Sequence, residues 1–287
     1  MKFHPIAVFL FYASYLLIPY TGFLIWRLWK RKKFLLFDVL FLVFCVVFLW
    51  CRFVEPHWLR VQETELNGLN VHADVVLVAD LHTGIFKGRS FVERLVEKVN
   101  AIDAQFIILA GDYVYEMSPE NLANTLEPLK HLNKPTYFVM GNHDRSASIK
   151  QTLSALGLKD IEHQVVDFGM FQLAGVGDYW ANDDQIKIPL PAKPTIMAAH
   201  NPDSAFKFND KNIKLVLSGH THCGQIRIPY LYRFIIPTDY DMDCGLQYAH
   251  NTITGKLPVY ITPGVGETAL PLRFLNPSTI DVLHLRP

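Results

Sequence analysis

The stretch Leu215-Val216-Leu217-Ser218-Gly219-His220-Thr221-His222-Cys223-Gly224-Gln225 decides how the rest of the chain is interpreted. An apolar run of the kind that forms a buried strand ends here in a turn of small residues. The turn carries His220 and His222, and side chains at positions i and i+2 of an extended segment point the same way. The glycines let the backbone bend closely around a bound group. Because imidazole is the commonest metal-ligating side chain, the stretch predicts a metal site at the end of a strand.

Four other strand-like runs end in the same way, at residues 75–79, 106–110, 136–140 and 195–199. Since ligands bind at the carboxyl ends of strands in open α/β sheets, we expect all these endings to meet at one edge. Taken singly, each residue has an ordinary explanation as a turn residue, a cap or a satisfied histidine. Five such endings in succession favour the metal site instead. The residues involved are Asp80, His82, Asp112, Asn142, His143, Asp144, His200, His220 and His222.

This set of side chains suits two divalent metal ions. Mixed carboxylate, amide and imidazole ligands fit Mn, Fe or Zn better than an all-oxygen Mg or Ca site. The sequence has no cluster of cysteines that would indicate structural zinc. A pair of ions about 3.5–4 Å apart can hold a phosphoryl group and activate water at neutral pH.

The ordered motifs resemble those of the calcineurin-like metallophosphoesterase superfamily, over roughly residues 70 to 287. That resemblance implies a four-layer α/β-β/α sandwich. The flanking residues resemble a bacterial subfamily of membrane-attached or exported phosphodiesterases, with relatives that act on lipid-linked pyrophosphates such as UDP-diacylglucosamine. The motifs are Asp80-x-His82, Gly111-Asp112, Gly141-Asn142-His143-Asp144, His200-Asn201-Pro202-Asp203, Gly219-His220-Thr221-His222, Pro263-Gly264-Val265-Gly266 and Pro271-Leu272-Arg273.

The same resemblance implies a role for each residue. Asp80, His82 and His222 would hold one metal. Asn142, His200 and His220 would hold the other, and Asp112 would bridge both. A bridging hydroxide would attack the phosphorus in line, without a covalent phospho-enzyme. His143 would be the general acid, and Asp144 would steer its imidazole and raise its pKa. Cys223 departs from the subfamily, which more usually has glycine there, and we expect it to be a small space-filling residue.

The soluble part alternates strands and helices up to about residue 160, which predicts βαβ units in a layered α/β domain. Short strands dominate after that point, and residues 178–194 and 229–255 are predicted to be long irregular loops around a binding site. The predicted helices are 91–99 capped by Ser90, 119–131 capped by Ser118, and 148–156 ended by Gly157. Further strands are predicted at 171–176, 213–217, 259–262 and 279–285.

The N-terminal part of the 287-residue chain is apolar in two runs, residues 5–26 and 34–50, the second interrupted by Asp38. At about 1.5 Å per residue, such runs suit helices that cross a bilayer core of about 30 Å. A cleaved signal peptide is the alternative, but the charged n-region is thin and no small-x-small cleavage site follows. We therefore predict a membrane anchor over residues 1–52, a connector with a leading strand over 53–69, and the phosphoesterase domain over 70–287.

The residues between the two runs carry five basic side chains, over 27–33. The positive-inside rule places this loop in the cytoplasm, so that everything after Arg52 is extracytoplasmic.

The formal net charge of zero gives no support for nucleic-acid binding. Four cysteines make no disulfide framework in a chain of this length. Cys223 and Cys244 would be free to pair in an extracytoplasmic domain, and the spacing leaves that question open.

The sequence thus predicts a phosphoesterase with two metal ions, attached as a multi-pass protein to a bacterial inner membrane. The partners expected are the membrane and a phosphodiester or pyrophosphate substrate, lipid-linked because enzyme and substrate would share one surface. One alternative is a UDP-diacylglucosamine-type pyrophosphatase that faces the cytoplasm. Another is a non-catalytic, membrane-anchored scaffold with the same fold. The natural substrate, the metals and the oligomeric state stay open.

Overall fold

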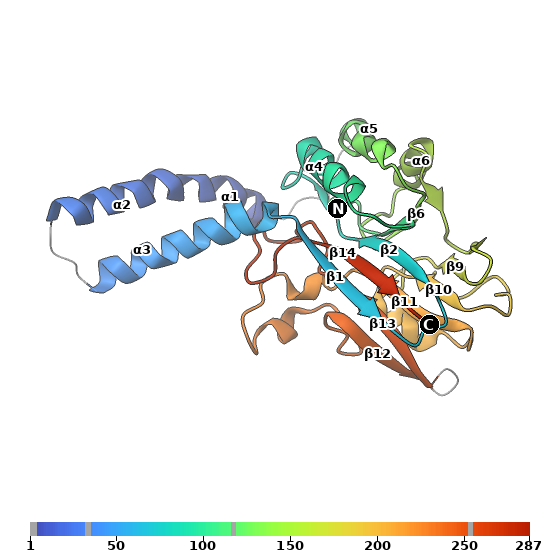
Figure 1. Ribbon diagram of the computed structural model, residues 1–287. Helices are drawn as coiled ribbons and strands as arrows, with labels where there is room; N and C mark the ends of the chain where they lie inside the picture. Colours follow the sequence, from blue (N-terminus) through green and yellow to red (C-terminus); the bar gives the residue numbers. More distant parts are fainter. Residues whose placement is uncertain (1–4, 32–35, 116–118, 252–254) are drawn as a thin grey trace.

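The computed structural model describes residues 5–31, 36–115, 119–251 and 255–287. A helical hairpin projects from a layered α/β domain (Figure 1). Its first arm is α1 (Pro5–Ala13), a 3-10 turn η1 (Ser14–Leu16) and α2 (Leu17–Arg31), and its second arm is α3 (Leu36–Leu49). Arg27 and Asp38 form an ion pair of 3.4 Å between the arms. The predicted basic loop is helical up to Arg31, and Lys32, Lys33 and Phe34 lie outside the described residues.

Both arms are long and apolar enough to cross a membrane, with helical stretches of 26 and 22 residues. The second stretch runs to His57, past the predicted end at residue 50, through η2 (Trp50–Val54) and η3 (Glu55–His57). Arg52 lies within this extension. Its buried guanidinium donates to the Ser14 hydroxyl and lies over the Phe11 ring, which ties the end of the second arm to the first.

Two six-stranded sheets form the domain. Parallel pairs join β2, β4 and β6 in the first sheet, and β9, β10, β11 and β13 in the second. The first sheet has the order β1 (Arg60–Leu66), β14 (Thr279–Leu285), β2 (Ala73–Val78), β4 (Phe106–Ala110), β6 (Thr136–Val139), β7 (Lys159–Asp160). The second has the order β12 (Gly245–Asn251), β13 (Gly255–Ile261), β11 (Ile213–Ser218), β10 (Thr195–Ala198), β9 (Gln172–Gly175), β8 (Val165–Asp167). A small pair, β3 (Thr83–Gly84) and β5 (Val114–Tyr115), lies apart.

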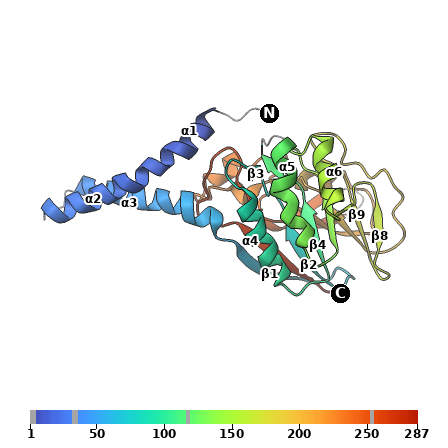
Figure 2. The ribbon, with the colours of Figure 1, turned by 90° about the horizontal axis from the view of Figure 1, so that it is seen from above.

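The layered sandwich predicted from the sequence is confirmed. Fully buried side chains from both sheets, such as Leu77, Ile108 and Leu215, form one shared core cluster. Helices α4 (Arg89–Asn100), α5 (Pro119–Leu126) and α6 (Ala147–Ala155) cover the other face of the first sheet (Figure 2). The fourth layer is thinner than predicted. Within the described residues, the 3-10 segment η5 (Pro202–Lys207) and loops cover the second sheet in place of α-helices.

Several predicted boundaries change for local reasons. Gly88, rather than Ser90, is the N-cap of α4. The helix predicted over 119–131 splits at Leu126 into α5 and a 3-10 segment η4 (Glu127–His131), because Pro128 cannot continue the α-helical hydrogen bonding. Ser118, its predicted cap, lies outside the described residues. The predicted end of α6 before Gly157 agrees with that glycine's φ of +88°.

One loop region contains a strand that the sequence pattern did not predict, whereas the connector contains the strand that it did predict. The loop predicted over 229–255 contains β12, which pairs antiparallel with β13, and a 3-10 turn η7 (Tyr232–Ile235). The segment predicted as a connector, 53–69, contains β1, which pairs in parallel with β14. The leading strand is therefore an edge strand of the first sheet.

Candidate metal centre

The carboxyl ends of five strands bring all nine predicted site residues into one cluster. Asp80 and His82 follow β2, and Asp112 follows β4. Residues 142–144 follow β6, His200 follows β10, and His220 and His222 follow β11. Because the parallel strands of each sheet point the same way, their ends meet at one edge of the sandwich.

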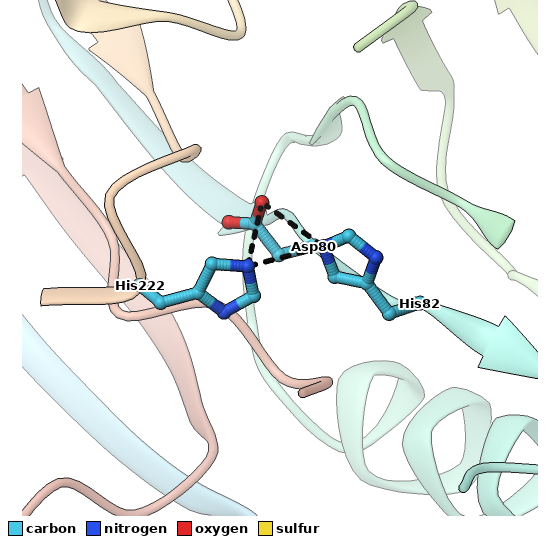
Figure 3. A group of neighbouring side chains, drawn as sticks. All are labelled: Asp80, His82 and His222. Carbon is cyan, nitrogen blue, oxygen red and sulfur yellow. Dashed lines mark hydrogen bonds and ion pairs between the residues drawn. The ribbon is translucent and has the colours of Figure 1, made fainter. Parts of the chain in front are cut away.

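A first group contains Asp80, His82 and His222 (Figure 3). The Nε2 atoms of the two histidines lie 3.0 Å apart. The Oδ1 atom of Asp80 lies 3.9 Å from Nε2 of His82 and 3.6 Å from Nε2 of His222. All three side chains are buried. One carboxylate oxygen and two imidazole nitrogens thus converge on one point.

A second group surrounds Nε2 of His200. This atom lies 3.2 Å from Oδ1 of Asn142, 3.2 Å from Nδ1 of His220 and 3.2 Å from Oδ2 of Asp112. The same Oδ2 atom of Asp112 lies 3.4 Å from Nε2 of His82. Asp112 therefore lies between the two groups, where a ligand shared by two ions would have to be.

The protonation of these side chains fits metal binding. Burial lowers the pKa of His82 and His220 to about 3, so each is a neutral imidazole with a free lone pair. Nδ1 of His200 lies 2.7 Å from the Ala110 carbonyl oxygen, and donation there leaves Nε2 for a cation. Burial opposes a charge on His200, yet the carboxylates of Asp112 and Asp80 raise its pKa to about 10. This position therefore attracts positive charge.

The donor set therefore fits two divalent cations. Two neutral imidazole nitrogens that face each other at 3.0 Å need a proton or a cation between them. A cation in the first group would satisfy both nitrogens together with the Asp80 carboxylate. The second group offers an amide oxygen, a carboxylate oxygen and two imidazole nitrogens, which match the mixed ligands of Mn, Fe or Zn.

The backbone at this edge adopts unusual conformations. Five of the site residues have positive φ angles: Asp80 at 55°, His82 at 43°, Asp112 at 58°, His220 at 68° and His222 at 49°. Left-handed backbone is costly for residues with a Cβ atom and is concentrated at functional sites. Gly219 permits the close approach of two of these turns, because a Cβ atom there would lie 2.6 Å from Oδ2 of Asp80.

The Asp144 side chain faces the backbone of the loop that carries Asp112. Its Oδ2 accepts the backbone N–H groups of Asp112 and Gly141 at 2.7 and 3.0 Å, and its Oδ1 accepts that of Tyr113 at 2.9 Å. Burial, followed by the charge of Asp112, raises the pKa of Asp144 to about 8. Because backbone donors engage both oxygens, Asp144 holds the Asp112 loop in place, and its steering of the His143 imidazole stays a prediction.

His143 lies at the edge of the cluster and is half-buried. Its backbone N–H donates to Oδ1 of Asp112 at 2.8 Å, which fixes the loop relative to the shared carboxylate. Its ring centroid lies 4.9 Å from that of His82 and 5.6 Å from that of Tyr115. The position suits a group that reaches a substrate bound at the cluster.

Three further residues next to the cluster carried no role in the sequence analysis. The Trp180 ring lies 4.6 Å from that of His220, and the Tyr115 ring 5.7 Å from that of His82. The fully buried Arg273 donates to the carbonyl oxygens of Gly264 and Gly266, beside Asp80. Trp180 lies in the loop 178–194, which we expected around a binding site, and Arg273 lies in the motif Pro271-Leu272-Arg273. Tyr115 had no such signal.

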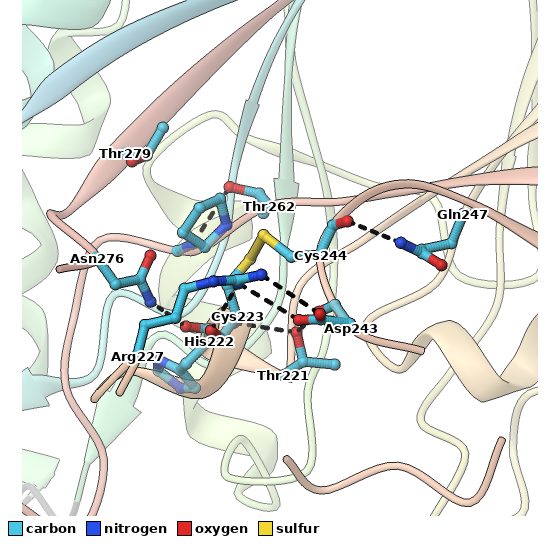
Figure 4. Close-up of a disulfide and its surroundings, with 12 residues drawn as sticks. Thr221, His222, Cys223, Arg227, Asp243, Cys244, Gln247, Thr262, Asn276 and Thr279 are labelled. Atoms are coloured by element: carbon cyan, nitrogen blue, oxygen red, sulfur yellow. Dashed lines mark hydrogen bonds and ion pairs between the residues drawn. A yellow bond between two sulfur atoms is a disulfide. The ribbon is translucent and has the colours of Figure 1, made fainter. Parts of the chain in front are cut away.

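Cys223 and Cys244 form a disulfide with a Cα–Cα distance of 4.9 Å (Figure 4). The sequence left this pairing open, and the expectation that Cys223 only fills space is wrong. The link joins the turn after β11 to the residue before β12, which come together because both strands pair with β13. The Asn276 amide also donates to the carbonyl oxygen of His222 at 2.7 Å. The turn that carries His222 is thus fixed from two sides.

Comparison with known proteins agrees with this geometry. The sequence model of the calcineurin-like phosphoesterase family matches residues 73–224. An uncharacterized metallophosphoesterase of Helicobacter pylori is 33% identical over 245 residues, which are 79% of this chain and 64% of that protein. Phosphodiesterase YaeI of Escherichia coli is 30% identical over 257 residues, which are 83% of this chain and 92% of that protein.

A transmembrane protein with metallophosphoesterase domain from Danio rerio is 28% identical over 250 residues, which are 77% of this chain and 54% of that protein. The chain thus spans little more than half of this relative and 64% of the Helicobacter pylori one. The family match covers more than half of the chain and contains all nine predicted site residues. On this evidence, the chain belongs to the calcineurin-like phosphoesterase family.

Proposed function

We propose that this protein is a membrane-anchored phosphoesterase that binds two divalent cations and hydrolyses phosphodiester or pyrophosphate bonds. The observation that carries the proposal is the position of Asp112. Its Oδ2 atom lies 3.4 Å from Nε2 of His82 and 3.2 Å from Nε2 of His200. It therefore lies between the first and the second metal group. A single structural metal would not need such a shared carboxylate.

The chain's own residues supply positioning and proton transfer. The two ions, when bound, would neutralise phosphoryl oxygens and lower the pKa of water. His143 is held beside the cluster by its backbone bond to Asp112, from where it protonates the leaving oxygen. Asp144 keeps that loop in place through its backbone bonds. This chemistry requires no side-chain nucleophile.

The anchor and the disulfide support an extracytoplasmic domain at a bacterial inner membrane. Disulfides persist in oxidising compartments and are rare in the cytosol, so the Cys223–Cys244 link favours that side. The basic residues between the apolar runs favour the same topology. Enzyme and substrate would then share one membrane surface, which favours a lipid-linked substrate.

The test of activity uses the full chain loaded with manganese and bis-p-nitrophenyl phosphate as substrate. We expect hydrolysis, about two metal ions per chain, and loss of most activity in Asp112→Asn and His143→Ala. Asp112→Asn should also lower the metal content, whereas His143→Ala should keep it. The exposed Asp103→Asn is the matched control and should behave like the wild type. Wild-type protein that takes up no metal during loading and shows no turnover would instead indicate a scaffold.

The orientation of the domain is tested separately. A reporter enzyme that is active only outside the cytoplasm, fused after Pro287, should be active in the proposed topology. Activity of a cytoplasmic reporter at the same position would instead support the cytoplasm-facing pyrophosphatase.

A further inference from the structure

A cavity of about 380 Å3 opens beside His222, within the range of about 300–1,000 Å3 found for small-molecule sites. Apolar side chains dominate its walls, and they come from the segment after β11 and from the loop over residues 268–270. The residues that define it are His222, Ile226, Ile235, Pro237, Ala269 and Leu270. Because His222 belongs to the first metal group, this apolar cavity lies next to the metal centre.

A second cavity, of about 430 Å3, adjoins the second metal group and has several charged side chains in its wall. Asn142, of the second metal group, lines it together with Arg145, Glu162, Asp178 and Trp180. The metal centre thus has an apolar cavity next to its first group and a cavity with charged side chains next to its second. A phosphoester with one apolar and one polar substituent would match this asymmetry.

The apolar cavity also lies next to the end of the membrane anchor. Gln225 donates to the carbonyl oxygens of Thr268 and Leu270, which fixes one wall. A few residues further on, the backbone N–H of Arg273 donates to the carbonyl oxygen of Cys51 at 2.9 Å. Cys51 belongs to the last turns of the second apolar stretch. The wall therefore lies where the helix leaves the predicted membrane, and Figure 1 shows the base of the hairpin against this part of the domain.

Ile235 of the cavity wall belongs to an exposed apolar segment, residues 230–235, which we call the rim. Tyr230 and Phe234 are 88% and 86% exposed, and Leu231 and Ile235 are also exposed. Aromatic side chains that face solvent close to a membrane anchor belong to the headgroup region of the bilayer. Exposed apolar patches of this kind mark membrane or ligand contacts. The rim would thus connect the cavity with the bilayer.

We propose that this cavity receives a hydrocarbon chain of a membrane lipid whose phosphoester is presented to the metal centre. The inference rests on the proposed phosphoesterase function and specifies its substrate as an alkyl- or acyl-bearing phosphodiester or pyrophosphate. The chain lies against Ile226, Ile235 and Leu270, the phosphoryl group lies at His222, and the polar substituent points toward Arg145 and Trp180.

The kinetic test uses the full, manganese-loaded chain in an amphipathic polymer and a series of p-nitrophenyl alkyl phosphates from methyl to octyl. The bond that breaks is the same throughout. Because each buried methylene favours binding, we expect KM to fall about fourfold per added methylene until the cavity is filled, with little change in kcat. Equal KM values along the series would overturn the proposal.

Variants of the cavity wall locate the effect. Ile235→Asp and Leu270→Asp each place a charge in the path of the alkyl chain. Each should reduce the ratio of octyl to methyl kcat/KM at least tenfold. Met170→Asp is the matched control, because Met170 is 86% exposed, lies outside the residues that line the cavity, and should keep the wild-type ratio. An unchanged ratio in both cavity variants would contradict the proposal.

Calorimetry gives a readout that does not depend on turnover. Octylphosphonate should bind more tightly than methylphosphonate, and with a more negative heat-capacity change, because alkyl surface is buried. Leu270→Asp should remove both differences. A protein that hydrolyses the methyl ester but shows no chain-length effect in either assay refutes the cavity assignment alone. A protein that binds octylphosphonate in this way but hydrolyses none of the esters refutes the catalytic proposal instead.

Discussion

Asp144 and Asp112 are neighbouring carboxylates that contact different kinds of groups at one site. Asp112 directs Oδ2 at two histidines, whereas Asp144 directs both oxygens at backbone N–H groups. The second arrangement keeps the first in position, because the N–H of Asp112 itself is one of the donors. A positioning residue of this kind should affect rate and stability without changing which groups titrate during turnover.

We predict that Asp144→Asn lowers kcat at least tenfold and the free energy of unfolding by about 1–3 kcal/mol, because an amide N–H2 would face backbone donors. The pH dependence of kcat/KM should keep its wild-type shape. A shift of the limb of that profile that reports the general acid would show that Asp144 tunes His143 instead. Steady-state kinetics between pH 5 and 10, with denaturant unfolding, provide the measurement.

Asp281 offers a prediction away from the metal centre. Burial raises the pKa of this carboxyl to about 6, although the Tyr260 hydroxyl donates to it at 2.8 Å. A folded-state pKa above the unfolded value stabilises the protein below about pH 4, and this contribution is lost as the pH rises through 6. The shift of about two units corresponds to roughly 3 kcal/mol.

Asp281→Asn should therefore remove up to about 3 kcal/mol of the fall in unfolding free energy between pH 4 and pH 8. The variant gains relative to the wild type at pH 8 and not at pH 4. Denaturant titrations at both pH values measure the difference. The exposed Asp103→Asn serves as the control, and parallel pH curves for Asp281→Asn and the wild type would contradict the assignment.

At the scale of elements, the turn after β11 combines several features that fix the backbone of the metal site. It contains two left-handed histidines, a disulfide cysteine and Gly219, whose missing side chain leaves room for Asp80. A Cβ atom at Gly219 would also lie 2.4 Å from Cβ of Ala79. The strand can therefore present both histidines only if this turn stays close to β2.

Gly219→Ala should separate the turn from Asp80 and so reduce both metal content and activity by at least tenfold. Gly88→Ala is the matched control, because Gly88 is exposed and a Cβ atom added there would have no neighbouring atom within 4 Å. Metal analysis and turnover of both variants provide the test. Wild-type metal binding in Gly219→Ala would show that the turn tolerates the added methyl group.

The Cys223–Cys244 link should contribute about 2–4 kcal/mol to stability, as expected for a loop of this length. Cys223→Ser/Cys244→Ser should lose that amount in denaturant unfolding. It should also bind metal more weakly, because His222 precedes the linked residue. Wild-type protein treated with a phosphine reductant should match the double variant. If neither differs from the oxidised protein, the disulfide has no role in holding the turn.

The sequence predicted those elements that are encoded by a pattern of neighbouring residues. Apolar runs such as 106–110 gave the buried strands, and their polar endings gave the metal cluster. The features that it missed depend on contacts between distant segments. The strand β12 has polar and exposed positions and is recognisable only by its pairing with β13. The role of Asp144 depends on backbone donors more than 30 residues away, and the disulfide depends on the shared neighbour of β11 and β12.

At the scale of the whole molecule, the first helix does more than extend into the predicted membrane. Ala7 is buried with Phe86 and Tyr115, and Phe11 stacks on Phe86 with centroids 5.4 Å apart. Phe86 in turn stacks on Tyr115 at 5.8 Å, and Tyr115 lies 5.6 Å from His143. A series of aromatic rings thus leads from the anchor to the proposed general acid.

We predict that Phe11→Ala in the full chain lowers kcat several-fold with little effect on metal content, because it loosens the rings beside His143. Phe9→Ala is the control, since Phe9 is an exposed ring on the same helix. Single-turnover rates and metal analysis of both variants distinguish the effects. Equal rates in the two variants would show that the packing of α1 has no catalytic consequence.

The contact between α1 and Phe86 also bears on how this enzyme can be handled. A soluble fragment that starts at residue 53 would lack not only the hydrophobic hairpin but also the cover over Phe86 and Tyr115. Two large rings next to the reaction centre would then face water. Such a fragment is expected to aggregate and to turn over slowly, so poor behaviour of a truncated preparation would say little about the intact protein.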